Sequence, residues 1–165
     1  MEVLGGNTIV QLTFSPTVCP KLQLPDTLKM VKNSGFSRIQ LERLNSASSP
    51  VQNDTSVSMV RERLSSAGIK LSGLTVRSLT GRKADSNERN LAYNLRQIEW
   101  DIHLARALGT KNIALSGGDS DQESFDDLVE GIQSLIERVP DVNIILMNRS
   151  DSCFNSLQDA QSVLS

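Results

Sequence analysis

Hydrophobic residues recur along the chain in a repeated order: a helical period, a short break and then a short apolar run. Four segments share this order: residues 28–41, 60–74, 104–115 and 135–146. In the first three, Gly35, Gly68 and Gly109 follow the helical period, where a left-handed residue ends a helix at the least steric cost. Pro140 and Asp141 stand at the break in the fourth. The pattern predicts four helix-to-strand units of one kind.

Five short segments, rich in Ile, Leu and Val, are apolar on both faces, as strands of a sheet covered by helices should be. They are "TIVQLTF" (8–14), "RIQLE" (38–42), "IKLSGLTV" (69–76), "NIAL" (112–115) and "VNIILM" (142–147). Five predicted helices alternate with them. Such alternation is typical of an α/β fold with a parallel sheet and right-handed crossovers.

Two architectures fit this order. One is a partial TIM-like barrel with about five parallel strands; the other is an open five-stranded doubly wound sheet, which the length of 165 residues suits better. Ser156 and Asp159 have the spacing of a helix start only two turns before the last residue, which favours an interrupted barrel. We expect one domain over residues 1–165, truncated at its C-terminus.

The starts of other helices are also marked in the sequence. In a capping box, a cap side chain and a carboxylate three positions later satisfy each other's backbone donors. Asp85 with Glu88 and Ser120 with Glu123 have this spacing, and Asp54 or Thr55 is predicted to cap the helix before Gly68. The serine-rich segment 44–56 between two periodic elements is predicted to be a loop.

Charge and cysteine content exclude some functions. The net charge is −2 with acids and bases interspersed, so no basic stripe predicts nucleic-acid binding. Cys19 and Cys153 have neither zinc spacing nor a disulfide framework, which suits a reducing compartment. No apolar run predicts a signal peptide or a membrane span, and we expect a cytoplasmic protein.

Four stretches together resemble a known family. They are "SPTVCPKLQLPDTLKMVKNSGFSRIQLE" (15–42), "VRERLSSAGIKLSGLTV" (60–76), "LARALGTKNIALSGG" (104–118) and "VNIILMNRSDS" (142–152). In this order they resemble the first five βα units of the xylose isomerase-like TIM barrels, a superfamily of sugar and sugar-phosphate isomerases and epimerases, inosose dehydratases and apurinic endonucleases. The resemblance covers residues 8–165. It implies metal-dependent proton transfer on a sugar or polyol.

The chain departs from the family pattern at two positions. The family's fifth strand ends in a metal-binding glutamate followed by asparagine and a histidine or arginine, and the resemblance places Met147, Asn148 and Arg149 there. A thioether is a poor ligand for Mn²⁺, Mg²⁺ or Zn²⁺ bound through hard oxygen donors, so we assign no metal ligand and no cofactor with confidence. Gln40 stands where the family often has a glutamate on its second strand.

The predicted strands bring several polar residues to one end of the sheet, where α/β folds bind ligands. Glu42 lies two residues after Gln40 and therefore on the same side of the strand, which makes it the best candidate for a general base. Arg43, Arg77 and Arg149 are candidates to hold an anionic group such as a sugar phosphate, and Asn148 is a further candidate ligand-binding residue.

Other polar features of the sequence favour structural roles. Gly117 and Gly118 before a helix are explained by turn geometry better than by an anion cradle, because acidic residues follow them. His103 is the single histidine, in mid-helix, and has no nucleophile beside it. Neither cysteine is predicted to react.

Two functions remain open. The first is a truncated or degenerate sugar (phosphate) isomerase or epimerase, weak or inactive as this chain alone. The second is a non-catalytic α/β binding or interaction module. In the partial-barrel interpretation the first and last strands keep unpaired backbone groups, which predicts self-association through the sheet edges.

Overall fold

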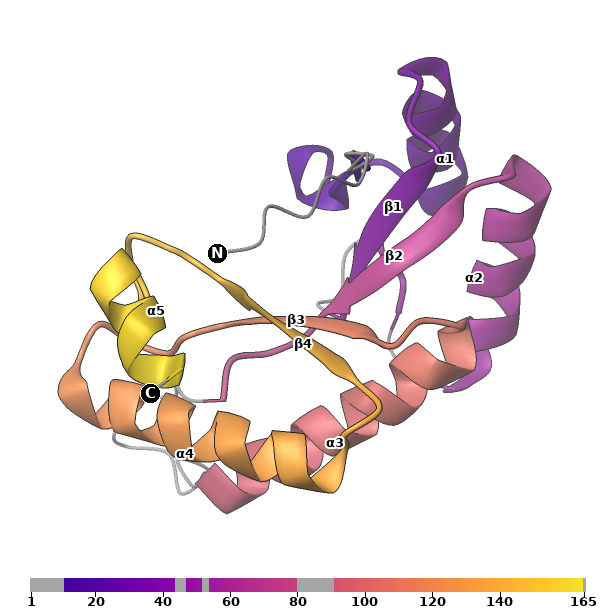
Figure 1. Ribbon diagram of the computed structural model, residues 1–165. Helices are drawn as coiled ribbons and strands as arrows, with labels where there is room; N and C mark the ends of the chain where they lie inside the picture. Colours follow the sequence, from indigo (N-terminus) through magenta and orange to yellow (C-terminus); the bar gives the residue numbers. More distant parts are fainter. Residues whose placement is uncertain (1–10, 44–46, 52–53, 80–90, 165) are drawn as a thin grey trace, which may run out of the picture.

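The computed structural model describes residues 11–43, 47–51, 54–79 and 91–164 (Figure 1). A short 3₁₀ helix, η1 (Pro16–Val18), precedes four strands and five helices within these ranges. In chain order they are α1 (Leu24–Asn33), β1 (Arg38–Glu42), α2 (Asp54–Ala67), β2 (Lys70–Thr75), α3 (Leu91–Leu108), β3 (Asn112–Ser116), α4 (Gln122–Arg138), β4 (Asn143–Met147) and α5 (Leu157–Leu164). No helix in these ranges is long and apolar enough to cross a membrane.

The strand order decides between the two predicted architectures. All neighbouring strands are parallel, and the order in space, β1-β2-β3-β4, is the order in the chain. A doubly wound sheet reverses its order at a switch point, whereas a barrel adds each strand beside the last. Successive helices from α1 to α4 contact one another and follow the same side of the sheet (Figure 1). The fold is therefore the barrel type, with an open sheet.

The prediction of five strands requires a correction, because the described residues form four. Of the predicted strand 8–14, the part from residue 11 onward contributes one parallel bridge, between Phe14 and Ile39. Phe14 N donates to Arg38 O at 3.1 Å, and Gln40 N donates to Phe14 O at 2.9 Å. Phe14 thus occupies the place of a first strand beside β1 without extending the ladder.

The two faces of the sheet differ in chemistry. One face packs on the helices and carries the buried core side chains Ile39, Leu41, Leu74, Ile113 and Leu115. The register places Glu42 beside Thr75, Thr75 beside Ala114 and Ala114 beside Ile145, and parallel partners share a face. We call this second face the inner face, because it corresponds to the interior of a barrel.

The inner face is partly polar, and its amide side chains bond across the strands. Asn143 Nδ2 donates to Asn112 Oδ1 at 2.8 Å, and Asn112 Nδ2 donates to Ser72 O at 2.6 Å. Ile145, between these polar positions and the strand ends, keeps 45% of its surface exposed. The helices therefore stabilise one face only, and the described residues leave the other accessible.

Most of the predicted helix signals are confirmed. Gly35, Gly68 and Gly109 have φ values of 80°, 70° and 90°, in the left-handed region that glycine adopts without a Cβ clash. The reciprocal cap at α5 is also present: Asp159 N donates to Ser156 Oγ at 3.1 Å, and Ser156 N donates to Asp159 Oδ2 at 2.8 Å.

The predicted cap of α4 was wrong by one residue. Asp121, not Ser120, is the N-cap, and its carboxylate accepts from Ser124 N at 2.7 Å. An aspartate directly after a serine competes for the same role, and local spacing does not separate them. The predicted Asp85 and Glu88 cap lies outside the described residues, as do the side chains of Asp54 and Thr55.

Candidate functional site

A cavity of about 380 Å³ lies at the carboxyl ends of the strands, on the inner face. Its walls come from the segment before β1, from β1 and β2, and from the end of β4. The lining residues are Thr13, Phe14, Ser15, Thr17, Gln40, Glu42, Thr75, Met147 and Arg149. We call it the inner-face cavity. It brings together three of the predicted site residues, Gln40, Glu42 and Arg149, although more than a hundred residues of sequence separate the last from the first two.

Hydrogen bonds fix the backbone of the candidate base. Glu42 N donates to Ser49 Oγ at 2.7 Å, and the same hydroxyl donates to Glu42 O at 2.7 Å. In the next residue, Arg43 N donates to Thr75 O at 2.8 Å, which continues the β1–β2 ladder beyond the strand. Glu42 is therefore held at a defined position on the rim of the sheet.

The Glu42 side chain is half-buried on the cavity wall. Burial raises the pKa of its carboxyl, because the charged form loses part of its hydration. Within the described ranges, no lysine, arginine or histidine forms an ion pair with it. A carboxylate in this environment is a stronger base than one in water, which suits it to proton transfer.

Gln40 and Thr75 form a polar pair next to Glu42. Gln40 Nε2 donates to Thr75 Oγ1 at 2.7 Å across the two strands. This bond orients the Gln40 amide and leaves its carbonyl oxygen as an acceptor. The two side chains add a hydrogen-bonding surface to the cavity but no charge.

Arg149 borders the cavity at the end of β4, where Asp151 already holds it. Its Nε and Nη2 atoms donate to the two carboxylate oxygens of Asp151 at 3.0 and 2.8 Å. The guanidinium lowers the pKa of Asp151, and the carboxylate raises the pKa of Arg149. Asn148 is exposed and does not border the cavity. Its predicted role in binding stays a prediction.

Arg43 and Arg77 share a buried carboxylate on α3. Arg43 Nε lies 2.8 Å from Asp101 Oδ1, and Arg77 Nε lies 3.4 Å from Asp101 Oδ2. Burial raises the pKa of Asp101, and the two guanidiniums offset part of that effect. Neither arginine lines the inner-face cavity. The structure thus divides the three predicted anion-binding arginines between two carboxylates, and their role in binding an anion stays a prediction.

Close packing explains the glycine at the end of β3. A Cβ atom on Gly117 would stand 2.8 Å from Cys153 Sγ and 3.1 Å from Phe154 N. Cys153 N also donates to Gly118 O at 3.3 Å, so the loops after β3 and β4 are joined. Burial raises the pKa of the Cys153 thiol. These contacts agree with the structural interpretation of the glycine pair and with an unreactive cysteine.

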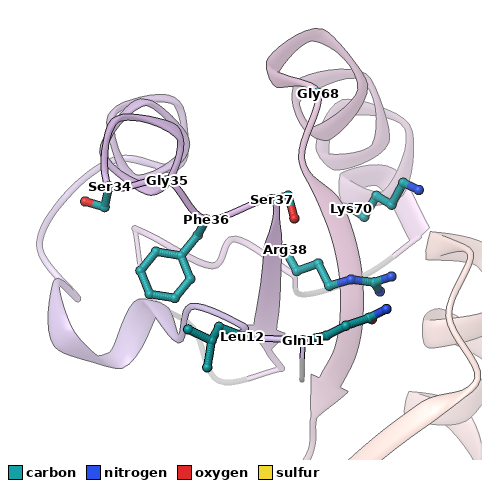
Figure 2. A pocket seen from close by; sticks show the side chains of 9 residues that line it. All are labelled: Gln11, Leu12, Ser34, Gly35, Phe36, Ser37, Arg38, Gly68 and Lys70. Atoms are coloured by element: carbon teal, nitrogen blue, oxygen red, sulfur yellow. The ribbon is translucent and has the colours of Figure 1, made fainter. Parts of the chain in front are cut away.

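Sequence reasoning missed a second cavity, of about 540 Å³, at the opposite end of the sheet (Figure 2). Arg38 and Lys70, the first residues of β1 and β2, border it together with Gly35 and Gly68, which follow the C-termini of α1 and α2. Figure 2 shows Phe36 and Leu12 near each other on one side. Helix C-termini present carbonyl groups, which the two cations complement. In barrels this end serves stability, whereas ligands bind at the other end.

The donors of the inner-face cavity do not fit a divalent metal. No group of three His, Cys, Asp or Glu side chains in the described ranges is arranged to hold one. Glu42 is the single carboxylate among the described residues that line the cavity, and Met147 offers a thioether. Hard cations such as Mg²⁺ and Mn²⁺ prefer several oxygen ligands.

Known structures show the same architecture. No family model and no curated protein matches the sequence. A xylose isomerase domain containing protein from Salmonella typhimurium LT2 superposes with a TM-score of 0.67 at 17% identity, over 92% of this chain and 55% of that one. The chain has the fold of part of a xylose isomerase-like TIM barrel. A xylose isomerase-like protein from Mycobacterium smegmatis, in complex with magnesium, gives 0.64 at 18% identity over 85% and 51%.

An L-ribulose 3-epimerase also superposes on the chain, with a TM-score of 0.67 at 16% identity over 94% of this chain and 56% of the epimerase. The chain therefore spans about half the length of these structures. A TIM barrel has sequential parallel strands inside a ring of helices, which agrees with the order β1 to β4 observed here. The superpositions establish the xylose isomerase-like fold. Because the sequence identities are low, the activity has to be argued from the site.

Proposed function

We propose that the inner-face cavity binds a sugar or a related polyol and that Glu42 transfers a proton to and from a carbon of this ligand. The observation that carries the proposal is the half-buried Glu42 carboxylate on the wall of a cavity at the ligand-binding end of a barrel sheet. Hydroxyl groups of Thr13, Ser15 and Thr17 on the facing segment offer hydrogen bonds to a polyol.

The chemistry available to this chain is limited to acid–base catalysis. A carboxylate removes a proton from the carbon next to a sugar carbonyl and can return it to the same or the adjacent carbon. Nothing else in the described cavity stabilises the negative charge on the resulting enediolate oxygen as a divalent metal would. The proposed isomerase or epimerase activity of this chain alone is therefore weak.

Deuterium exchange tests the proton transfer apart from net turnover. The probe is L-ribulose in D₂O, with exchange at the carbons flanking the carbonyl followed by proton NMR. The native chain should exchange faster than buffer, and Glu42→Gln should reduce the excess rate by about 10²-fold or to background, because the amide is no base.

Glu62→Gln provides the matched control, because it removes the same charge from an exposed position on α2. It should leave the exchange rate unchanged. Equal exchange by native protein and Glu42→Gln would remove Glu42 from the mechanism. Circular dichroism establishes that all three proteins are folded.

A specific observation favours a second candidate function, self-association through the sheet edge. β4 is the last strand of the described sheet, so one row of its backbone groups has no strand partner there, and Ile145 is 45% exposed on the inner face. Exposed edges of this kind pair with other chains. A second copy of the chain is the partner that we propose.

The mass in solution tests this second proposal. Light scattering across a range of concentrations should show dimers that Ile145→Lys weakens by about tenfold or more, because a charged edge residue opposes strand pairing. Ile136→Lys is the control, since Ile136 is 56% exposed on α4, away from the sheet. A native chain that stays monomeric throughout contradicts the proposal.

A further inference from the structure

The inner-face cavity is lined mainly by neutral polar groups and by one carboxylate. The Glu42 carboxylate accepts only, and Gln40 directs one of its two amide N–H groups to Thr75, which leaves its carbonyl oxygen for a ligand. Met147 adds a sulfur that accepts weakly. The hydroxyl groups of the lining residues both donate and accept, so they suit any polyol, and Glu42 is the group that can discriminate between ligands.

The positive charges around the cavity are already matched by carboxylates. Arg149 lines it, but Asp151 holds the guanidinium at two points, at 3.0 and 2.8 Å. Arg43 and Arg77 bond to Asp101 and do not line the cavity. No lysine or histidine occurs among the described residues that line it. Among the described residues that line the cavity, the charge left without a counter-ion is therefore that of Glu42.

A cation therefore complements the charge of the cavity better than an anion does. An ammonium group is attracted to carboxylates and carries three donors for nearby acceptors. A phosphate would instead face the Glu42 carboxylate without a free cation, which costs electrostatic free energy.

From this distribution of charge and acceptors we infer that the preferred ligand of the inner-face cavity is an amino sugar or amino polyol, whose protonated amine pairs with Glu42. This inference rests on the proposed binding of a polyol at the same cavity and names the class of polyol. The amine supplies the positive charge that Glu42 lacks as a partner. The same pairing selects against phosphorylated sugars.

Three hexose probes test the inference by isothermal titration calorimetry: D-glucosamine at a pH at which its amine is protonated, D-glucose and D-glucose 6-phosphate. Glucosamine should bind at least about tenfold more tightly than glucose, and glucose 6-phosphate more weakly than glucose. Glu42→Gln should abolish this preference, so that the variant binds glucosamine no more tightly than it binds glucose. Glu62→Gln should alter none of the three affinities.

The outcomes separate this inference from the proposal on which it rests. Equal affinity for glucosamine and glucose overturns the inference and leaves polyol binding standing. Tightest binding of glucose 6-phosphate overturns it as well and points to Arg149 released from Asp151. A glucosamine preference that survives in Glu42→Gln overturns the assigned contact. If none of the three sugars binds, the inference and the binding of hexose polyols fail together.

Discussion

A shift of one residue along the end of β1 changes the surroundings of a charged side chain. Glu42 and Arg43 are adjacent in the sequence, yet Glu42 lines the inner-face cavity and Arg43 bonds to Asp101 on α3. The alternation of side chains along a strand causes this separation, and it made Glu42 and Gln40 neighbours as the sequence predicted. The sequence did not show that Arg43 and Arg77 would form ion pairs with Asp101, because Asp101 lies in a helix that is distant along the chain.

The raised pKa of Glu42 predicts a pH dependence of stability. Folding raises the pKa of this carboxyl above its ordinary value of 4.5, so the folded protein binds the proton more tightly than the unfolded chain does. The stability that this gives is complete below pH 4.5 and is lost as the pH rises from there through the folded pKa. Above that window the carboxyl is ionised in both states, and the folded state carries the cost of partly burying the charge.

Urea denaturation of native protein and Glu42→Gln across this range measures the effect. The free energy of unfolding of the native protein should fall relative to that of the variant as the pH rises through the window, because Gln does not titrate. The raised pKa of Asp101 is common to both proteins and cancels in the difference. A constant difference would show that Glu42 is well solvated, and a change in the opposite direction would show that the folded state favours its ionised form.

At the scale of elements, short local signals predicted helix ends well and strand partners less well. The reciprocal bonds of Ser156 and Asp159 and the three left-handed glycines depend on neighbours a few residues away, and they are present as predicted. The segment 8–14 has the composition of a strand, but in its described part only Phe14 bridges to β1. A ladder needs a partner in register, and composition does not specify one.

Packing between loops gives a prediction at this scale. Gly117→Ala should lower the free energy of unfolding by about 1–3 kcal/mol, because the new methyl group would overlap Cys153 Sγ, 2.8 Å from the Cβ position. Urea denaturation measures it. Combining the change with Cys153→Ala removes the sulfur and should recover part of the loss, so the two effects should not add. Full additivity would show that the contact with Phe154, at 3.1 Å, dominates.

At the scale of the whole molecule, the described half of a barrel exposes the face that a complete barrel would enclose. The helices cover the outer face, while Asn143, Ile145 and the cavity residues lie on the inner one. This arrangement makes the cavity accessible, and it also leaves Glu42 as the single candidate catalytic carboxylate among the residues that line it.

Metal addition should therefore leave the stability unchanged. A thermal unfolding scan with and without millimolar Mn²⁺ or Mg²⁺ should give the same midpoint, because no group of three suitable ligands is present in the described ranges. A ligand that binds only the folded state would raise the midpoint. An upward shift would reveal a metal site and strengthen the isomerase interpretation despite Met147.

The sequence by itself determined the local and periodic features of this protein: helix ends, the composition of the strands, the parallel α/β class and the side of β1 on which Gln40 and Glu42 lie. These follow from interactions within a few residues and from the fixed periods of helix and strand. Only the tertiary structure decided that the strands run in sequential order, that Arg43 and Arg77 share Asp101, and that Met147 and Arg149 join Glu42 around one cavity. Those relations join segments up to more than a hundred residues apart, and the packing of the sheet against its helices sets them.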